Sequence, residues 1–234
     1  QPQVDARSFE IVGFEVLARW QHPEHGLLGP QRFLSTASEM QMESQIDSMV
    51  FRKAITECSG VFSPDEAPRL SFNVSLPRIM DPELVTDAHR LHYPGVVSLE
   101  LLETIFLEEE SEEVMMRIDT LRDLGFDFQV DDFGSGRASI IALQRLAPDR
   151  LKIDGRLVSP IAESEAARQL VLSIIDIGKS LGVGVTAEGV ETKDQAIFLS
   201  ETYCDVLQGY YFSRPVPFSE IRTMVPTSWI RKSA

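Results

Sequence analysis

The chain has 234 residues, of which 43% are hydrophobic and 25% charged, a composition typical of a globular protein with ample core. Its formal charge of −14, from 22 basic and 36 acidic residues, argues against a polymeric DNA or RNA partner, because such partners need a basic surface. No apolar run approaches the roughly 20 residues that span a bilayer, and the cysteines, Cys58 and Cys204, form no disulfide framework or zinc-finger pattern, which is typical of the cytoplasm.

Short apolar runs alternate along the chain with segments of helical periodicity. The runs rich in Val, Ile, Leu and Phe predict strands at 9–17, 70–74, 96–101, 126–130, 150–153, 183–187 and 206–212. Apolar residues at helical spacing predict two helices within 30–58 and one helix each over 112–124 and 166–181. Gly125 and Gly182 are expected to end the helices that precede them. The pattern from Thr192 to Gln195 predicts a capping box that begins another helix.

This alternation predicts an α/β fold with a mostly parallel sheet. An open doubly wound sheet and a (β/α)8 barrel both fit the pattern. Polar residues at or near the C-terminal ends of six predicted strands favour the barrel, in which all such ends converge on one face. These residues are Asn73, Glu100, Asp131, Lys152, Glu188 and Gln208.

The densest chemical signal is the pair Asp131-Asp132 before Gly134 at the end of a predicted strand. Adjacent carboxylates repel each other unless cations neutralise them, and a glycine permits a tight loop near a ligand. Asp-Asp before glycine is also a common turn composition. The pair by itself leaves a metal site and a plain turn about equally open.

The other strand ends favour the metal site. Glu15, Asn73, Glu100 and Asp131 offer hard oxygen ligands, which suit Mg²⁺ or Mn²⁺ better than zinc. Taken singly, Glu15 could be a surface residue and Asn73 a turn cap. Strand alternation places the side chain of Lys152 inside a barrel, where it needs carboxylates such as Asp154 nearby, and a plain salt bridge is the less favoured explanation.

The chain resembles a known family through motifs spread over its whole length. They are Glu15-Val16-Leu17 (with Val16 where Ala is usual), Phe72-Asn73-Val74-Ser75, Glu100-Leu101-Leu102-Glu103, Asp131-Asp132-Phe133-Gly134, Lys152-Ile153-Asp154, Ala187-Glu188-Gly189-Val190-Glu191 and Gln208-Gly209-Tyr210. In this order they resemble the EAL domains, bacterial phosphodiesterases that linearise cyclic di-GMP. Leu102, where Thr is typical, and Arg137, where an aromatic residue is common, depart from the pattern.

The resemblance implies a single EAL domain over 1–234 with a modified TIM-type (β/α)8 barrel that contains one antiparallel strand. It implies that the family's opening helix and most of its first strand would precede Gln1, so that the barrel is trimmed at its N-terminus. It also implies two Mg²⁺ or Mn²⁺ ions, with Asp131 bridging them, and Ca²⁺ that binds without supporting turnover. The implied metal ligands are Glu15, Asn73, Glu100, Asp131, Asp132 and Glu188.

For catalysis, the resemblance implies that Lys152 orients the attacking water and that Glu188 is the candidate general base. Asp132 assists them, and Glu103 braces the loop 132–137. Arg19 is expected to contact a substrate phosphate. The other residues expected around the substrate are Leu17, Gln208, Asp154 and Glu191.

The implied activity is hydrolysis of cyclic di-GMP to linear pGpG by the output domain of a larger bacterial signalling protein. Regulatory or GGDEF-type domains, a homodimer and a cytoplasmic location without membrane contact by this domain are further expectations, and the full-length protein could still be membrane-attached. Two alternatives stay open. A degenerate domain could act as a cyclic di-GMP receptor, and a purely structural dimerisation domain would need no polar strand ends.

Overall fold

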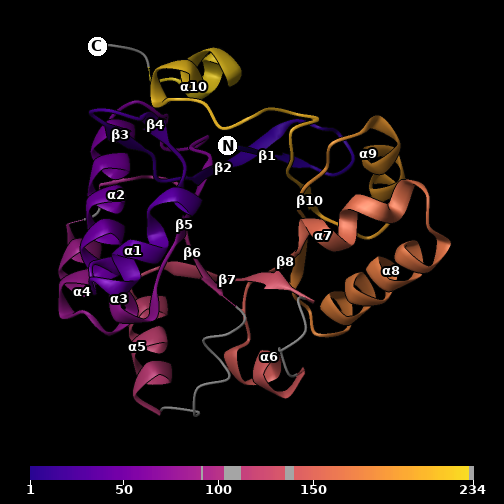
Figure 1. Cartoon of the computed structure of the whole chain (residues 1–234), viewed down its shortest axis with the longest axis horizontal. Coiled ribbons are helices and arrows are strands. Elements are labelled where there is room, and N and C mark those ends of the chain that lie inside the picture. Colours follow the sequence, from indigo (N-terminus) through magenta and orange to yellow (C-terminus); the bar gives the residue numbers. More distant parts are fainter. Residues whose placement is uncertain (91, 103–111, 135–139, 232–234) are drawn as a thin grey trace.

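The computed structural model describes residues 1–90, 92–102, 112–134 and 140–231. Within these residues, eight strands close into a barrel in the order β1-β10-β9-β8-β7-β6-β5-β2 (Figure 1). Only β1 runs antiparallel to both of its neighbours, and the remaining pairs are parallel. The strands are β1 (Pro2–Asp5), β2 (Ile11–Val16), β5 (Arg69–Asn73), β6 (Val97–Leu102), β7 (Phe126–Phe133), β8 (Arg150–Ile153), β9 (Gly184–Ala187) and β10 (Val206–Leu207).

Helices surround the barrel on its outside, and a small hairpin of β3 (Trp20–His22) and β4 (Gly26–Leu28) follows β2 (Figure 1). Among the helices that the structure describes, none combines the length and the apolar character needed to cross a bilayer. The α-helices are α1 (Leu34–Glu39), α2 (Glu43–Cys58), α3 (Leu76–Met80), α4 (Pro82–His89), α5 (Glu112–Asp123), α6 (Ile140–Leu146), α7 (Gly155–Val158), α8 (Glu165–Ser180), α9 (Lys193–Ser200) and α10 (Phe218–Met224).

The hydrophobic core lies between the barrel wall and the helices. Successive residues of a strand point to opposite faces, so every second side chain faces outward. Phe72 of β5 packs against Phe51 of α2, with ring centroids 4.9 Å apart. Leu151 and Val185 face Gly178 of α8, where a side chain on the helix would meet them.

The inside of the barrel is polar. Gln129 of β7 donates a hydrogen bond of 2.9 Å to Ser71 Oγ of β5, across the interior, because β6 separates these two strands in the wall. Barrel interiors are commonly filled by branched apolar residues. This barrel therefore derives its packing energy from the outer layer, and its interior depends on hydrogen bonds and ion pairs between the strands.

The sequence predictions are confirmed for the closed barrel with one antiparallel strand, for the helices around 112–124 and 166–181, and for the two helices within 30–58. The strand predicted at 206–212 is wrong beyond Leu207. The chain turns there, because Gly209 lies so close to the backbone of Val190 that no side chain would fit. The strand predicted from residue 9 begins at Ile11, because Phe9 adopts a left-handed turn conformation with φ 59°.

The pattern missed β1 (Pro2–Asp5), which is too short and too polar to be recognised. Residues 2–5 pair with both β10 and β2 and close the barrel, and the expectation about the segment before Gln1 stays a prediction.

The capping box of α9 holds the loop that follows β9. Thr192 Oγ1 accepts a hydrogen bond from the Gln195 amide, and Gln195 Oε1 accepts from the amides of Thr192 and Glu191 at 2.9 and 2.8 Å. Gln195 Nε2 also donates to the Ser159 carbonyl at 2.9 Å. One side chain thus joins the start of the helix to the neighbouring β8–α8 connection.

Replacing Thr192 with alanine removes the cap and should lower the free energy of unfolding by about 1 kcal/mol. Thr120→Ala is the matched control, because the exposed Thr120 hydroxyl only donates a hydrogen bond to the Met116 carbonyl of the same helix, α5. This change should alter the free energy of unfolding by no more than about 0.5 kcal/mol. Urea denaturation of both variants measures the difference. Equal midpoints for the two variants would contradict the capping role.

Candidate active site and metal centre

Lys152 is fully buried at the centre of a group of carboxylates that come from separate strands. Its Nζ lies 2.6 Å from Glu100 Oε2 on β6 and 2.6 Å from Glu188 Oε1 after β9. The same ammonium lies 3.1 Å from Asp131 Oδ1 on β7 and 3.8 Å from Glu15 Oε1 on β2. One buried cation therefore joins residues from five elements at the C-terminal mouth of the barrel.

Burial and these contacts shift the pKa values of Lys152, Glu100 and Glu188. Burial by itself would lower the pKa of Lys152, but Glu100, Glu15, Glu188 and Asp131 outweigh burial and raise it well above its ordinary value, so this lysine is charged. Burial raises the pKa of Glu100 well above its ordinary value, and neighbouring carboxylates add to the rise in spite of Lys152. Burial likewise raises the pKa of Glu188 to about 8.

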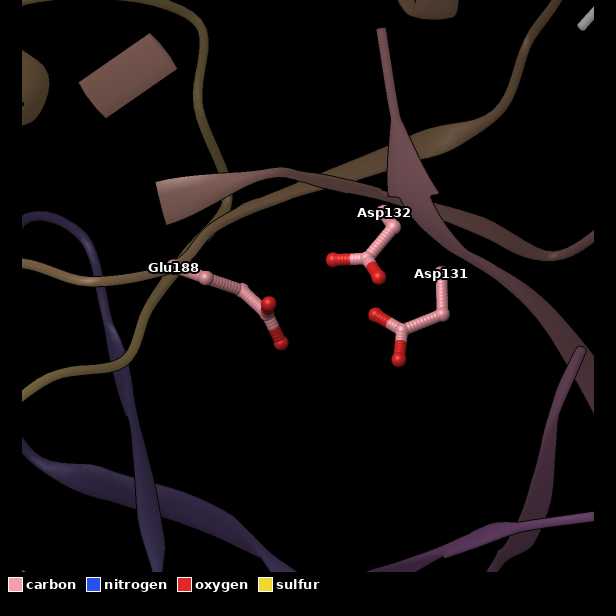
Figure 2. Close-up of side chains that lie close together, drawn as sticks. All are labelled: Asp131, Asp132 and Glu188. Atoms are coloured by element: carbon pink, nitrogen blue, oxygen red, sulfur yellow. The ribbon is translucent and has the colours of Figure 1, made fainter. Parts of the chain in front are cut away.

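A distortion of β7 directs two adjacent carboxylates into the site. Neighbouring residues of a regular strand would point to opposite faces. The pairing of β7 with β8 shifts register between Val130 and Phe133, and Asp132 adopts the left-handed conformation with φ 53°, which aspartate tolerates better than most residues. Asp131 and Asp132 consequently both face Glu188 (Figure 2), and one oxygen from each of the three lies within 4.8 Å of the others.

Glu15 is held by two amide side chains. Asn73 Nδ2 donates to Glu15 Oε1 at 2.7 Å, and Gln208 Nε2 donates to Glu15 Oε2 at 2.5 Å. Burial opposes ionisation of Glu15, but Lys152 and these two hydrogen bonds lower its pKa below the ordinary value. Gln208 in turn accepts a hydrogen bond of 3.0 Å from Gln3 Nε2, so β1 also supports the site.

The donor set fits hard divalent cations. Glu100 Oε1 is buried and has no hydrogen-bond partner among the residues that the structure describes, although its other oxygen binds Lys152. An ionised oxygen in that state is costly unless a cation reaches it. One ammonium faces more carboxylates than it can neutralise, and oxygen-only ligands are those that Mg²⁺ and Mn²⁺ prefer. The expectation of a metal site therefore agrees with the chemistry of these residues.

The segments that follow Lys152 and Glu188 lie close together because each contains a glycine. A Cβ on Gly189 would lie 2.8 Å from the Cα of Gly155, and Gly189 has a φ of 65°, which disfavours other residues. The two backbones therefore touch directly after β8 and β9. This contact brings the C-terminal ends of the two strands into the same site.

The structure does not bring every predicted residue into the cluster. Asp154 does not contact Lys152, which corrects that expectation: it caps α7 and forms an ion pair with Arg156, whose hydrogen bonds lower the pKa of Asp154. Arg19 is exposed and donates to the neighbouring Ala18 carbonyl at 2.7 Å. Their roles toward a substrate stay predictions.

Leu17 is half-buried after β2, and Glu191 is exposed beside the cap of α9. Leu102, at the end of β6, is exposed. Glu103 and Arg137 lie outside the described residues.

Two supporting residues escaped the sequence pattern. Gln3 belongs to a strand too short to recognise, and its role depends on the distant Gln208. Asp47, on α2, accepts hydrogen bonds from the amide and the hydroxyl of Ser75 at 2.9 and 2.7 Å, and so fixes the turn after Asn73. In the sequence Asp47 is one aspartate within a predicted helix, and nothing there distinguishes it from a surface residue.

Comparison with known proteins agrees with this geometry. A model of the EAL domain family matches residues 1–215. The oxygen sensor protein DosP of Escherichia coli (strain K12) is 37% identical over 229 residues, which cover 94% of this chain and 28% of DosP. The cyclic di-GMP phosphodiesterase NbdA of Pseudomonas aeruginosa is 34% identical over 227 residues, covering 94% of this chain and 29% of NbdA. The chain thus spans less than a third of the length of either relative.

Solved structures show the same fold. The PaMucR phosphodiesterase in complex with c-di-GMP superposes with a TM-score of 0.82 at 28% identity, covering 94% of this chain and 92% of that chain. The EAL enzyme Bd1971 in its cAMP- and cyclic-di-GMP-bound form gives a TM-score of 0.87 at 25% identity, covering 97% of this chain and 63% of Bd1971. The barrel seen here is therefore the fold of EAL enzymes.

Replacing Lys152 with methionine should lower the free energy of unfolding of metal-free protein by roughly 3–5 kcal/mol, because the buried carboxylates lose their cation. Lys179→Met is the matched control. Its ion pair with Asp205 is partly exposed and should contribute less than about 1 kcal/mol. Urea denaturation with and without Mg²⁺ measures both variants. Similar losses for the two lysines would contradict the central role of Lys152.

The pKa of about 8 for Glu188 predicts a pH dependence, since the ordinary value is 4.5. Between these values the folded protein keeps a proton that the unfolded chain has released. The free energy of unfolding of metal-free protein should therefore fall as pH rises from about 5 to 8, and the contribution of Glu188 should change no further above that. Glu188→Gln should show a smaller fall in urea denaturation at stepped pH. An unchanged slope in this variant would refute the assignment.

Proposed function

The chain belongs to the EAL domain family, and we propose that it hydrolyses cyclic di-GMP to linear pGpG with two bound Mg²⁺ or Mn²⁺ ions. The observation that carries this proposal is the convergence of Glu15, Asn73, Glu100, Asp131, Asp132 and Glu188 around Lys152. A barrel that served only as a scaffold would gain nothing from so many buried carboxylates, because their desolvation opposes folding.

The residues divide the chemistry between them. Divalent cations bound here would supply a water of lowered pKa and stabilise negative charge on the phosphoryl oxygens. Lys152, fixed by four carboxylates, directs its N–H groups in set directions and is suited to orient the attacking water through a hydrogen bond. The pKa of Glu188 would fall beside positive charge, which leaves its carboxylate able to accept a proton from that water.

Substrate recognition is proposed for residues at the rim of the same mouth. Arg19 is exposed after β2 and is suited to a phosphate oxygen. Asp154 could accept hydrogen bonds from the edge of a base, and Gln208 adjoins the metal ligand Glu15. The local positive charge of the cations would allow a dianionic substrate to approach a chain of net charge −14.

We also propose that this unit serves as the output domain of a longer signalling protein. The relatives that it matches are more than three times its length. One of them, MucR of Pseudomonas aeruginosa, is described as a bifunctional diguanylate cyclase and cyclic di-GMP phosphodiesterase; 96% of this chain aligns with 34% of MucR at 30% identity.

Incubation with cyclic di-GMP should give pGpG by chromatography in Mg²⁺ or Mn²⁺, and no product after chelation or in Ca²⁺. Glu188→Gln should lower kcat by about 10²–10⁴-fold through loss of the base, and Glu15→Gln should raise the metal concentration required. Glu57→Gln, a surface change on α2, is the control and should leave kcat and the required metal concentration unchanged.

The same assay separates the alternatives when binding is measured in parallel. Cyclic di-GMP that binds but is not cleaved under any metal condition would refute hydrolysis and support a receptor. Cleavage that survives both chelation and Glu188→Gln would refute the metal-dependent mechanism. Absence of both binding and cleavage by folded protein would refute any role of this site toward the nucleotide.

A further inference from the structure

The barrel has a second mouth at the N-terminal ends of its parallel strands, opposite the carboxylates. Arg69 is the first residue of β5 and Arg150 is the first residue of β8. Both line a cavity of about 290 Å³, together with Gln3 and apolar residues such as Val96 and Val206. The charged residues lining this cavity are both arginines, although the chain as a whole carries a charge of −14.

The two arginines differ in whether their guanidinium groups already have ion-pair and hydrogen-bond partners. Arg69 forms an ion pair with Asp127 and donates to Ser98 Oγ at 2.6 Å. In Arg150, Nη1 is buried and has no hydrogen-bond partner in the described part of the chain. A buried guanidinium N–H without an acceptor is costly, so its position at a cavity indicates that something else accepts from it.

The surrounding carboxylates do not meet this need. Asp127 and Asp205 are the ones whose charges act on Arg150. Asp127 is paired with Arg69, and Asp205 binds Lys179 at 2.7 Å. Burial, and then the charge of Arg69, lower the pKa of Arg150 below its ordinary value. The fold therefore keeps two like charges near each other, and the nearby carboxylates form their ion pairs with Arg69 and Lys179.

The guanidinium of Arg150 lies close to the neighbouring strand. Gly184 is the register partner of Arg150 on β9, and a Cβ there would lie 3.4 Å from Arg150 Cζ, which is ordinary van der Waals contact. The guanidinium therefore packs beside β9 at the edge of the cavity.

We propose that this second mouth is a binding site for a small oxyanion such as inorganic phosphate, held by Arg150 and Arg69. Guanidinium groups match the paired oxygens of phosphate with parallel hydrogen bonds. A cavity of about 290 Å³ lies just below the range of pockets for drug-sized ligands and suits a small ion better than a nucleotide. This site is separate from the acidic one and does not depend on its proposed activity.

Calorimetric titration of metal-free protein tests the proposal, because without cations the carboxylate site repels phosphate. Sodium phosphate should bind one ion per chain, whereas sodium chloride at the same ionic strength should not. Arg150→Gln should weaken phosphate binding at least about tenfold, as expected for loss of a charged hydrogen bond. Arg222→Gln, an exposed arginine of α10, should bind as the unchanged protein does.

Circular dichroism confirms that each variant is folded. If Arg150→Gln does not fold, Arg150→Lys replaces it, because it keeps the charge but loses the paired geometry and should still weaken binding measurably. Phosphate heats equal to those of chloride would overturn the proposal. So would unchanged phosphate affinity in a folded Arg150 variant, or an equal loss of affinity in Arg222→Gln.

Discussion

The burial of one ammonium among several carboxylates is the constraint on which the rest of this structure depends. Lys152 contacts acidic side chains from β2, β6, β7 and the end of β9, so one buried charge links these strands at the mouth of the barrel. Removing charges from water costs several kcal/mol for each ion, and a buried pair recovers this only with good geometry. The arrangement therefore stabilises the barrel little by itself, while it fixes the geometry of the site closely.

The polar interior follows from the same constraint. Hydrogen bonds such as that between Gln129 and Ser71 occupy the space that apolar side chains fill in other barrels. Apolar side chains pack instead on the outside of the barrel against the helices, as Phe72 does against Phe51. This division leaves both mouths available for charged groups. One mouth gathers carboxylates that suit cations, and the other gathers two arginines that suit an anion.

Small backbone distortions convert this fold into a chemical site. The shifted register of β7 and the left-handed Asp132 place two adjacent carboxylates on one side of a strand. The contact between Gly155 and Gly189 brings the loops after β8 and β9 together. Each distortion has a local cost, which the surrounding barrel offsets. Strain of this kind commonly occurs where a protein binds a ligand, and here it lies beside Asp131 and Glu188.

The sequence by itself determined the alternation of strands and helices, the barrel class and the residues at the strand ends, because these depend on local periodicity and on motifs of fixed order. It did not determine β1, since a four-residue strand has almost no periodic signal. The expectation that Asp154 would lie beside Lys152 was also wrong. Asp154 pairs with Arg156 instead, and this choice depends on where each side chain points. Only the tertiary structure decided that Lys152 meets its carboxylates, that Gln3 reaches Gln208, and that Arg150 Nη1 has no hydrogen-bond partner among the described residues. These contacts join distant strands, and their distances are set by closure of the barrel, which no local pattern encodes.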